Sequence, residues 1–134
     1  MTRHILTIGP DDSIVMLEEH MEAFRFRHLP VVDGDVLVGL INYSDVLHAL
    51  SSRLSKSAPE ENEILHQLPA RRIMREDFVT VRPTESLERV AALLWDTRVG
   101  CVPVTEADGT LVGIITEGDF VRLTHHFLTA SAVM

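Results

Sequence analysis

LVGIITEGD, residues 111–119, repeats LVGLINYSD, residues 37–45, and this repeat decides the fold. Both stretches hold a glycine, a run of aliphatic residues and a closing aspartate in the same order, at an offset of 74 residues. Two shorter motifs recur at an offset of 73: Thr-h-x-Pro (h, hydrophobic) at Thr7 and Thr80, and Pro-Val at Pro30 and Pro103. The extra residue falls in a turn, where insertions are tolerated. The chain is therefore built from two copies of one unit.

Each copy is predicted to contain five elements in the order β-α-β-β-α. Strands are expected at 5–8, 29–32 and 36–41, and at 79–81, 102–105 and 111–116. The first helix of copy one follows from the helical spacing of Ile14, Leu17, Met21 and Phe24, and the equivalent positions of copy two are Leu87, Val90, Leu94 and Thr97. The closing helices are expected over about 45–54 and about 119–127.

The predicted fold class is α+β, with two β-α-β-β-α repeats packed with pseudo-twofold symmetry. Repeat 1 is expected over 1–58, and a linker helix (60–68) with repeat 2 over 59–134. A half of about 55 residues is marginally stable alone, so the two repeats are expected to form one module.

The composition argues against several classes of partner and site. The chain has 134 residues and a formal net charge of −8, and Lys56 is its only lysine. Nucleic acids and anionic membranes require concentrated basic residues, so neither is an expected partner. The apolar runs fall short of the roughly 20 residues of a membrane helix. One cysteine cannot form an internal disulfide, so a cytoplasmic location is expected.

In these motifs the sequence resembles the tandem cystathionine-β-synthase (CBS) domain pair, or Bateman module, over nearly its whole length. The resemblance rests on the openings at Thr7 and Thr80, the h-h-Pro strands, the ending 113–119 and the leader Arg72-Ile73-Met74 before the second opening. It implies a regulatory module that binds AMP, ADP, ATP or a related adenosyl ligand such as S-adenosylmethionine in clefts between the repeats. It also implies a homodimer formed through helices and an unknown regulated protein.

Asp119 and Thr116 are the most informative candidate site residues. A carboxylate can accept hydrogen bonds from both hydroxyls of a ribose. Thr-x-x-Asp before an apolar helix is also typical of a capping box, with Thr116 as the N-cap. Both interpretations remain open from the spacing, and the resemblance favours the ligand role.

The resemblance implies two clefts, each with residues of both repeats. The first cleft would combine Asp119 and Thr116 with Thr7, Arg27, His28, Leu29 and Pro30. The second would combine Asp45 and Asn42 with Thr80, Arg82, Cys101 and Val102. Arg27 and His28 make the first cleft the better phosphate site. Against this choice, no leader like 72–74 precedes Thr7, and Asn42 departs from the expected Thr or Ser in the second cleft.

Three other features favour structural roles. The adjacent histidines 125 and 126 point apart on a helix, so no metal site is expected. Cys101 lies in an apolar strand and is expected to be a buried thiol. Trp95 ends a run, 90–95, that is apolar on more than one helical face, so it belongs either to the core or to a homodimer contact.

Three functions are compatible with a chain of this kind: an adenine-nucleotide sensor, a ligand-free dimerisation or protein-interaction module, and an enzyme. The chain has no visible nucleophile–base pair, phosphate-cradling glycine loop or metal-ligand spacing. We therefore expect a sensor that is not an enzyme and requires no cofactor, with the interaction module as the alternative.

Overall fold

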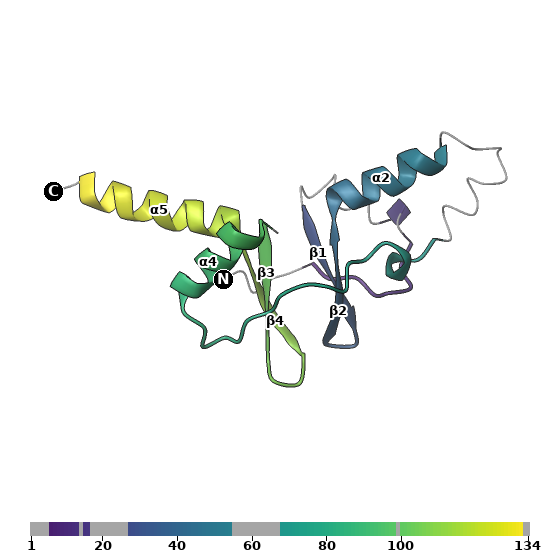
Figure 1. Cartoon of the computed structure of the whole chain (residues 1–134), viewed down its shortest axis with the longest axis horizontal. Coiled ribbons are helices and arrows are strands. Elements are labelled where there is room, and N and C mark those ends of the chain that lie inside the picture. The colour runs from purple at the N-terminus through teal and green to yellow at the C-terminus, as the bar shows by residue number, and fades with distance from the viewer. Residues whose placement is uncertain (1–5, 14, 17–26, 55–67, 99, 133–134) are drawn as a thin grey trace. The chain divides into compact units, whose positions relative to one another are not determined.

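A computed structural model describes residues 6–13, 15–16, 27–54, 68–98 and 100–132. These residues belong to two compact units, Leu6–Phe78 (the first unit) and Val79–Met134 (the second unit). The described segment 68–78 contains the motif Arg72-Ile73-Met74 and is called the leader from here on; it packs with the first unit, although it precedes the second repeat in the chain. The expected α+β fold is confirmed in both units (Figure 1).

The first unit is organised around an antiparallel hairpin of β1 (His28–Asp33) and β2 (Val36–Asn42). Gly34 adopts a φ of 64° in the connecting turn, a conformation that glycine adopts readily. Ile8 extends the hairpin by a parallel bridge to Val31, where the Ile8 N–H donates to the Pro30 carbonyl at 3.2 Å. The expected strand at 5–8 therefore contributes this one bridge among its described residues.

The helix that closes the first unit is α2 (Tyr43–Leu54), and it begins two residues before its predicted start. The Tyr43 N–H donates to the Arg27 carbonyl at 2.8 Å, which ties the start of α2 to the start of β1. A short 3₁₀ helix, η1 (Ala70–Arg72), lies in the leader, and the Ala70 N–H donates to the Asp12 carbonyl at 2.8 Å.

The second unit repeats this plan with β3 (Cys101–Thr105), β4 (Leu111–Thr116), α4 (Leu87–Thr97) and α5 (Glu117–Ala132). The hairpin is again antiparallel, and Val81 bridges Val104 as Ile8 bridges Val31. The Glu117 N–H donates to the Gly100 carbonyl at 3.1 Å, the counterpart of the bond from Tyr43 to Arg27. Equivalent residues of the two sequence repeats therefore form equivalent backbone hydrogen bonds in the two units.

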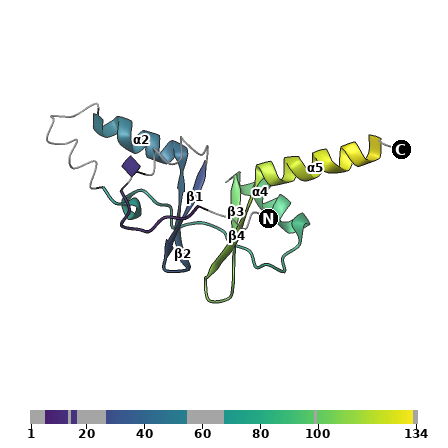
Figure 2. The same ribbon diagram turned by 180° about the vertical axis from the view of Figure 1, so that it is seen from behind.

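In each unit the closing helix leaves the end of the second strand of the hairpin, at the end opposite the hairpin turn (Figures 1 and 2). This arrangement places the first residue of β1 or β3 beside the residue that precedes the closing helix. His28 faces Asn42 in the first unit, and Cys101 faces Thr116 in the second. These four positions are all candidate site residues.

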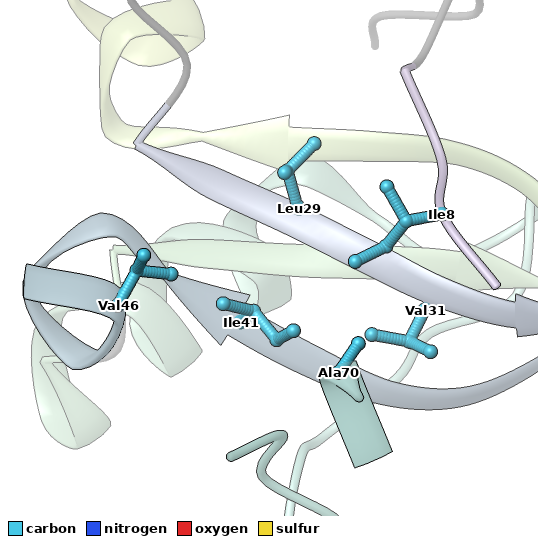
Figure 3. Close-up of a cluster of buried hydrophobic side chains, with 6 residues drawn as sticks. All are labelled: Ile8, Leu29, Val31, Ile41, Val46 and Ala70. Carbon is cyan, nitrogen blue, oxygen red and sulfur yellow. The ribbon is translucent and has the colours of Figure 1, made fainter. Parts of the chain in front are cut away.

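Each hairpin packs its apolar side chains into a small core. The core of the first unit contains Ile8, Leu29, Val31, Ile41, Val46 and Ala70 (Figure 3). The core of the second unit contains Val81, Val90, Leu94, Val102, Val104 and Ile115. In α4, Val90 and Leu94 are buried as the helical spacing predicts, whereas Leu87 and Thr97 are exposed.

Two sequence predictions lie outside the described residues. They are the helical face formed by Ile14, Leu17, Met21 and Phe24, and the linker helix expected over 60–68, of which only Leu68 is described. Among the residues that are described, no helix is long and apolar enough to cross a membrane.

Candidate functional site

Thr116 and Asp119 form a reciprocal capping box at the start of α5. The Thr116 N–H donates to Asp119 Oδ2 at 2.9 Å, and the Asp119 N–H donates to Thr116 Oγ1 at 3.3 Å. Thr116 Oγ1 also lies 3.3 Å from Asp119 Oδ2. The capping interpretation of this motif is therefore confirmed. Capping also fixes the carboxylate at the first turn of the helix, where free N–H groups favour negative charge.

Asp119 is ionised in this setting. Desolvation by itself raises the pKa of this carboxyl, but hydrogen bonds from the Thr116 backbone and from Arg122 lower the pKa below its usual value overall. The Arg122 guanidinium contacts Oδ1 through Nη2 from the next turn of the same helix. The carboxylate is therefore an acceptor at neutral pH, with a basic group beside it.

Asp45 holds the equivalent position at the start of α2, where it pairs with Arg75. Arg75 Nε lies 3.0 Å from Oδ2 and Nη2 lies 3.0 Å from Oδ1, so the pair is bidentate. Hydrogen bonding to Asp45 raises the pKa of Arg75 above its usual value. Arg75 is carried by the leader, whose backbone forms a bridge to Leu40 of β2.

His28 and Asn42 are hydrogen-bonded across the hairpin of the first unit, with 2.8 Å between His28 Nδ1 and Asn42 Oδ1. His28 belongs to the first of the two clefts expected from the resemblance and Asn42 to the second. The structure brings them together because they are directly opposite in the strand register. Asn42 and Thr116 hold equivalent positions in the two repeats, but the Asn42 side chain contacts the opposite strand, whereas the Thr116 side chain caps a helix.

The remaining candidate residues differ in how much of the side chain a ligand can reach. Thr7, Arg27, Thr80 and Arg82 are exposed. The side chains of Leu29, Pro30, Cys101 and Val102 are buried. Leu29, Pro30, Cys101 and Val102 can therefore offer a ligand their backbone groups but not their side chains.

The two units divide the candidate residues between them. The first unit holds Thr7, Arg27, His28, Leu29, Pro30, Asn42 and Asp45, and the second holds Thr80, Arg82, Cys101, Val102, Thr116 and Asp119.

Sequence reasoning missed Arg122 and Arg75, the basic partners of the two aspartates. The i,i+3 spacing of Asp119 and Arg122 is a local signal for the first pair. Asp45 and Arg75 are 30 residues apart, and no local rule finds that pair.

Two further expectations concern metal and the apolar run on α4. The described residues contain no group of three or more His, Cys, Asp or Glu side chains that could hold a metal ion, and His125 and His126 are exposed on α5.

Val90 and Leu94 of the apolar run belong to the core, whereas Trp95 is 74% exposed. The Arg98 guanidinium lies over its ring, 5.6 Å from the centroid. The core interpretation is therefore confirmed for Val90 and Leu94 and wrong for Trp95.

Known sequences resemble the chain over most of its length. It is 31% identical over 130 residues to a CBS domain-containing protein of Dictyostelium discoideum, covering 92% of this chain and 86% of that protein. It is 28% identical over 121 residues to inosine-5′-monophosphate dehydrogenase of Methanocaldococcus jannaschii, covering 90% of this chain but only 22% of the enzyme. An uncharacterized protein of the same organism is 26% identical, and the chain spans 44% of its length.

Solved structures of other proteins are similar to this chain in fold and contain the same pair of repeats. The structure of CBSX2 in complex with AMP has a TM-score of 0.79 and 28% identity, covering 95% of this chain and 93% of that one. The CBS domain pair of protein MJ0100, in complex with 5′-methylthioadenosine and S-adenosyl-L-methionine, has a TM-score of 0.76 and 25% identity, covering 94% and 92%. The CBS domain family model matches this sequence twice, at residues 1–52 and 70–126. The chain belongs to the CBS domain family and is a tandem pair of CBS domains.

Proposed function

We propose that this CBS domain pair is a regulatory module that binds an adenosyl ligand, namely AMP, ADP, ATP or S-adenosylmethionine. The observation that carries the proposal is the Asp119 carboxylate, which is ionised and fixed at the start of α5 by Thr116. Similar CBS pairs hold AMP, or 5′-methylthioadenosine and S-adenosyl-L-methionine. The net charge of −8 with a single lysine supports a small-molecule partner over a nucleic acid or an anionic membrane.

In this proposal Asp119 recognises the ribose. Oδ2 accepts from the backbone and the hydroxyl of Thr116, so the ribose hydroxyls would donate to the two acceptor positions of Oδ1, one of which Arg122 now occupies. The ligand would displace Arg122, whose side chain is 75% exposed. An exposed ion pair is worth only about 0.2–1 kcal/mol, so this displacement is a small cost.

We propose the same site residues that the sequence leads us to expect. The two repeats are proposed to span residues 1–58 and 59–134. For the first site, the resemblance implies Asp119, Thr116, Thr7, Arg27, His28, Leu29 and Pro30, and we propose these as ligand-binding residues. For the second, it implies Asp45, Asn42, Thr80, Arg82, Cys101 and Val102, and we propose these likewise. The exposed Arg27 guanidinium supports a phosphate-bearing ligand in the first site, because arginine binds phosphate through paired donors.

Calorimetric titration of AMP, ADP, ATP and S-adenosylmethionine tests the proposal. Asp119→Asn removes the negative charge and should weaken binding at least about tenfold, because hydrogen bonds to charged groups contribute roughly 1.5–3 kcal/mol. Glu117→Gln is the matched control, since it removes one charge from the same helical turn and should leave affinity unchanged. Equal affinities of Asp119→Asn and the unchanged chain would refute the assignment of Asp119 to the site.

Regulation follows if the ligand has different affinities for two conformations of the module, because it then shifts their populations. We propose that a partner protein in the cytoplasm reads this shift and that the module itself performs no catalysis. Turnover of a nucleotide by the purified protein would overturn the second statement.

A ligand-free interaction module is the second candidate function. Five apolar side chains of α4 and α5 support it, since each is more than half exposed: Leu87, Trp95, Val121, Phe127 and Leu128. Exposed apolar groups are typical of protein–protein contacts where they form one contiguous patch. The absence of a thermal shift with every adenosyl ligand, together with a tight homodimer, would favour this function.

A further inference from the structure

We propose that Arg75 competes with the ligand for Asp45, so that the Asp45 site binds a ribose only when Arg75 is displaced. This inference rests on the proposed adenosyl function, and it adds a residue that sets the affinity of one of the two sites. The observation that carries it is the bidentate pair between the Arg75 guanidinium and both oxygens of Asp45, at 3.0 Å each.

The pair uses the acceptor groups that ribose recognition needs. Two adjacent ribose hydroxyls donate to a carboxylate through its two oxygens. Arg75 Nε and Nη2 already donate to those same oxygens, in the parallel fork geometry that makes arginine–carboxylate pairs specific. Each oxygen keeps a second acceptor position, but a ribose whose two hydroxyls engage both oxygens approaches the same bidentate face and must therefore replace the guanidinium.

The leader holds Arg75 in position for this contact. The Leu40 N–H donates to the Arg75 carbonyl at 3.0 Å, and the Arg75 N–H donates to the Leu40 carbonyl at 2.8 Å. The neighbouring Met74 packs over Gly39, where an added Cβ would lie 2.5 Å from the Met74 sulfur. The backbone of residue 75 is thus fixed at the edge of β2, and only its side chain needs to move.

The strength of the competition is modest. The Arg75 side chain is 56% exposed and the Asp45 side chain 24% exposed, so water and salt screen the pair. The interaction free energy of an exposed ion pair changes an equilibrium constant roughly two- to fivefold. We therefore expect Arg75 to reduce ribose affinity at Asp45 severalfold without blocking the site.

Adenosine is the appropriate probe for calorimetry because it carries the ribose but no phosphate. Removing a positive charge from the protein then has no effect on long-range attraction of the ligand. Arg75→Gln should raise adenosine affinity at the Asp45 site roughly two- to fivefold, and Arg75→Lys should give a smaller gain. Adding Asp45→Asn to Arg75→Gln should abolish the gain.

Arg71→Gln is the matched control. Arg71 lies in the same leader and pairs with Asp11 at 2.8 Å, and both of these side chains are more than half exposed. This substitution should leave adenosine binding unchanged, and thermal unfolding of all variants should verify that each is folded.

The outcomes separate this inference from the proposed function. If the unchanged chain binds adenosyl ligands and Arg75→Gln gives no gain, or a loss, the competition is refuted while the adenosyl function stands. If no variant binds any adenosyl ligand, both proposals are overturned. A gain that persists in Arg75→Gln with Asp45→Asn also overturns the competition, because the effect would not act through Asp45.

Discussion

Cys101 shows how burial controls the chemistry of a single side chain. It is 2% exposed at the start of β3, and desolvation raises the pKa of its thiol to about 11. Because the thiolate is the reactive form of cysteine, the folded protein holds this group inert at neutral pH. The sequence prediction of a buried thiol is confirmed.

The raised pKa predicts a loss of stability in alkali. The unfolded thiol ionises near pH 8.5, so the contribution to stability is fully present below that pH. It is lost as the pH rises toward about 11, because ionisation then favours the unfolded chain. The expected loss in the free energy of unfolding is roughly 3 kcal/mol. Urea unfolding near pH 8 and near pH 11 measures it.

Cys101→Ala is the control, because it removes the titrating group and leaves the other alkaline titrations in place. The variant should lose less stability between the two pH values than the unchanged chain does. The same pH dependence in both proteins would contradict the prediction.

At the scale of elements, the contact between the leader and β2 depends on the absence of a side chain at Gly39. An added Cβ would lie 2.5 Å from the Met74 Sδ and 2.8 Å from its Cγ, closer than van der Waals contact permits. Gly39 therefore permits the close approach that places Arg75 beside Asp45.

Gly39→Ala should lower the free energy of unfolding by about 1–3 kcal/mol, the usual cost of overpacking. Chemical denaturation measures the change. In a double-mutant cycle with Met74→Ala the cost should shrink, because the shorter side chain leaves room for the new methyl group. Additive effects of the two substitutions would show that the clash does not control stability here.

At the scale of the whole molecule, the exposed apolar side chains of α4 and α5 predict self-association. We propose a homodimer in which Trp95 and the other exposed apolar side chains of these two helices are covered by a second copy. Exposed tryptophan side chains are frequent centres of binding energy in interfaces.

Trp95→Asp should weaken the dimer by at least about tenfold, since it replaces a large apolar contact by a charge that must be desolvated. Sedimentation velocity over a range of concentrations measures the equilibrium. Val36→Asp is the matched control, because Val36 is 42% exposed and belongs to β2, not to the helices of the proposed surface. Dimerisation of Trp95→Asp with the affinity of the unchanged chain would exclude this surface.

Much of the fold was predictable because its signals are local. The two hairpins and the box formed by Thr116 and Asp119 each depend on spacings of a few residues, and the repeat shows itself because the same short motifs recur. A capping box needs only two residues one helical turn apart, so the sequence suffices to propose it. The burial of Cys101 also followed from the apolar strand around it.

The long-range pairs could not be predicted, because their geometry depends on how strands and leader are brought together. The contact of His28 with Asn42 depends on the register of the first hairpin, and the pair of Asp45 with Arg75 depends on which strand the leader joins. The two aspartates hold equivalent sequence positions, yet Thr116 contacts Asp119 from the end of β4 and Arg122 contacts it from the same helix, whereas Arg75 contacts Asp45 from the leader. Periodicity and motifs specified each copy, and packing over tens of residues made the copies chemically different.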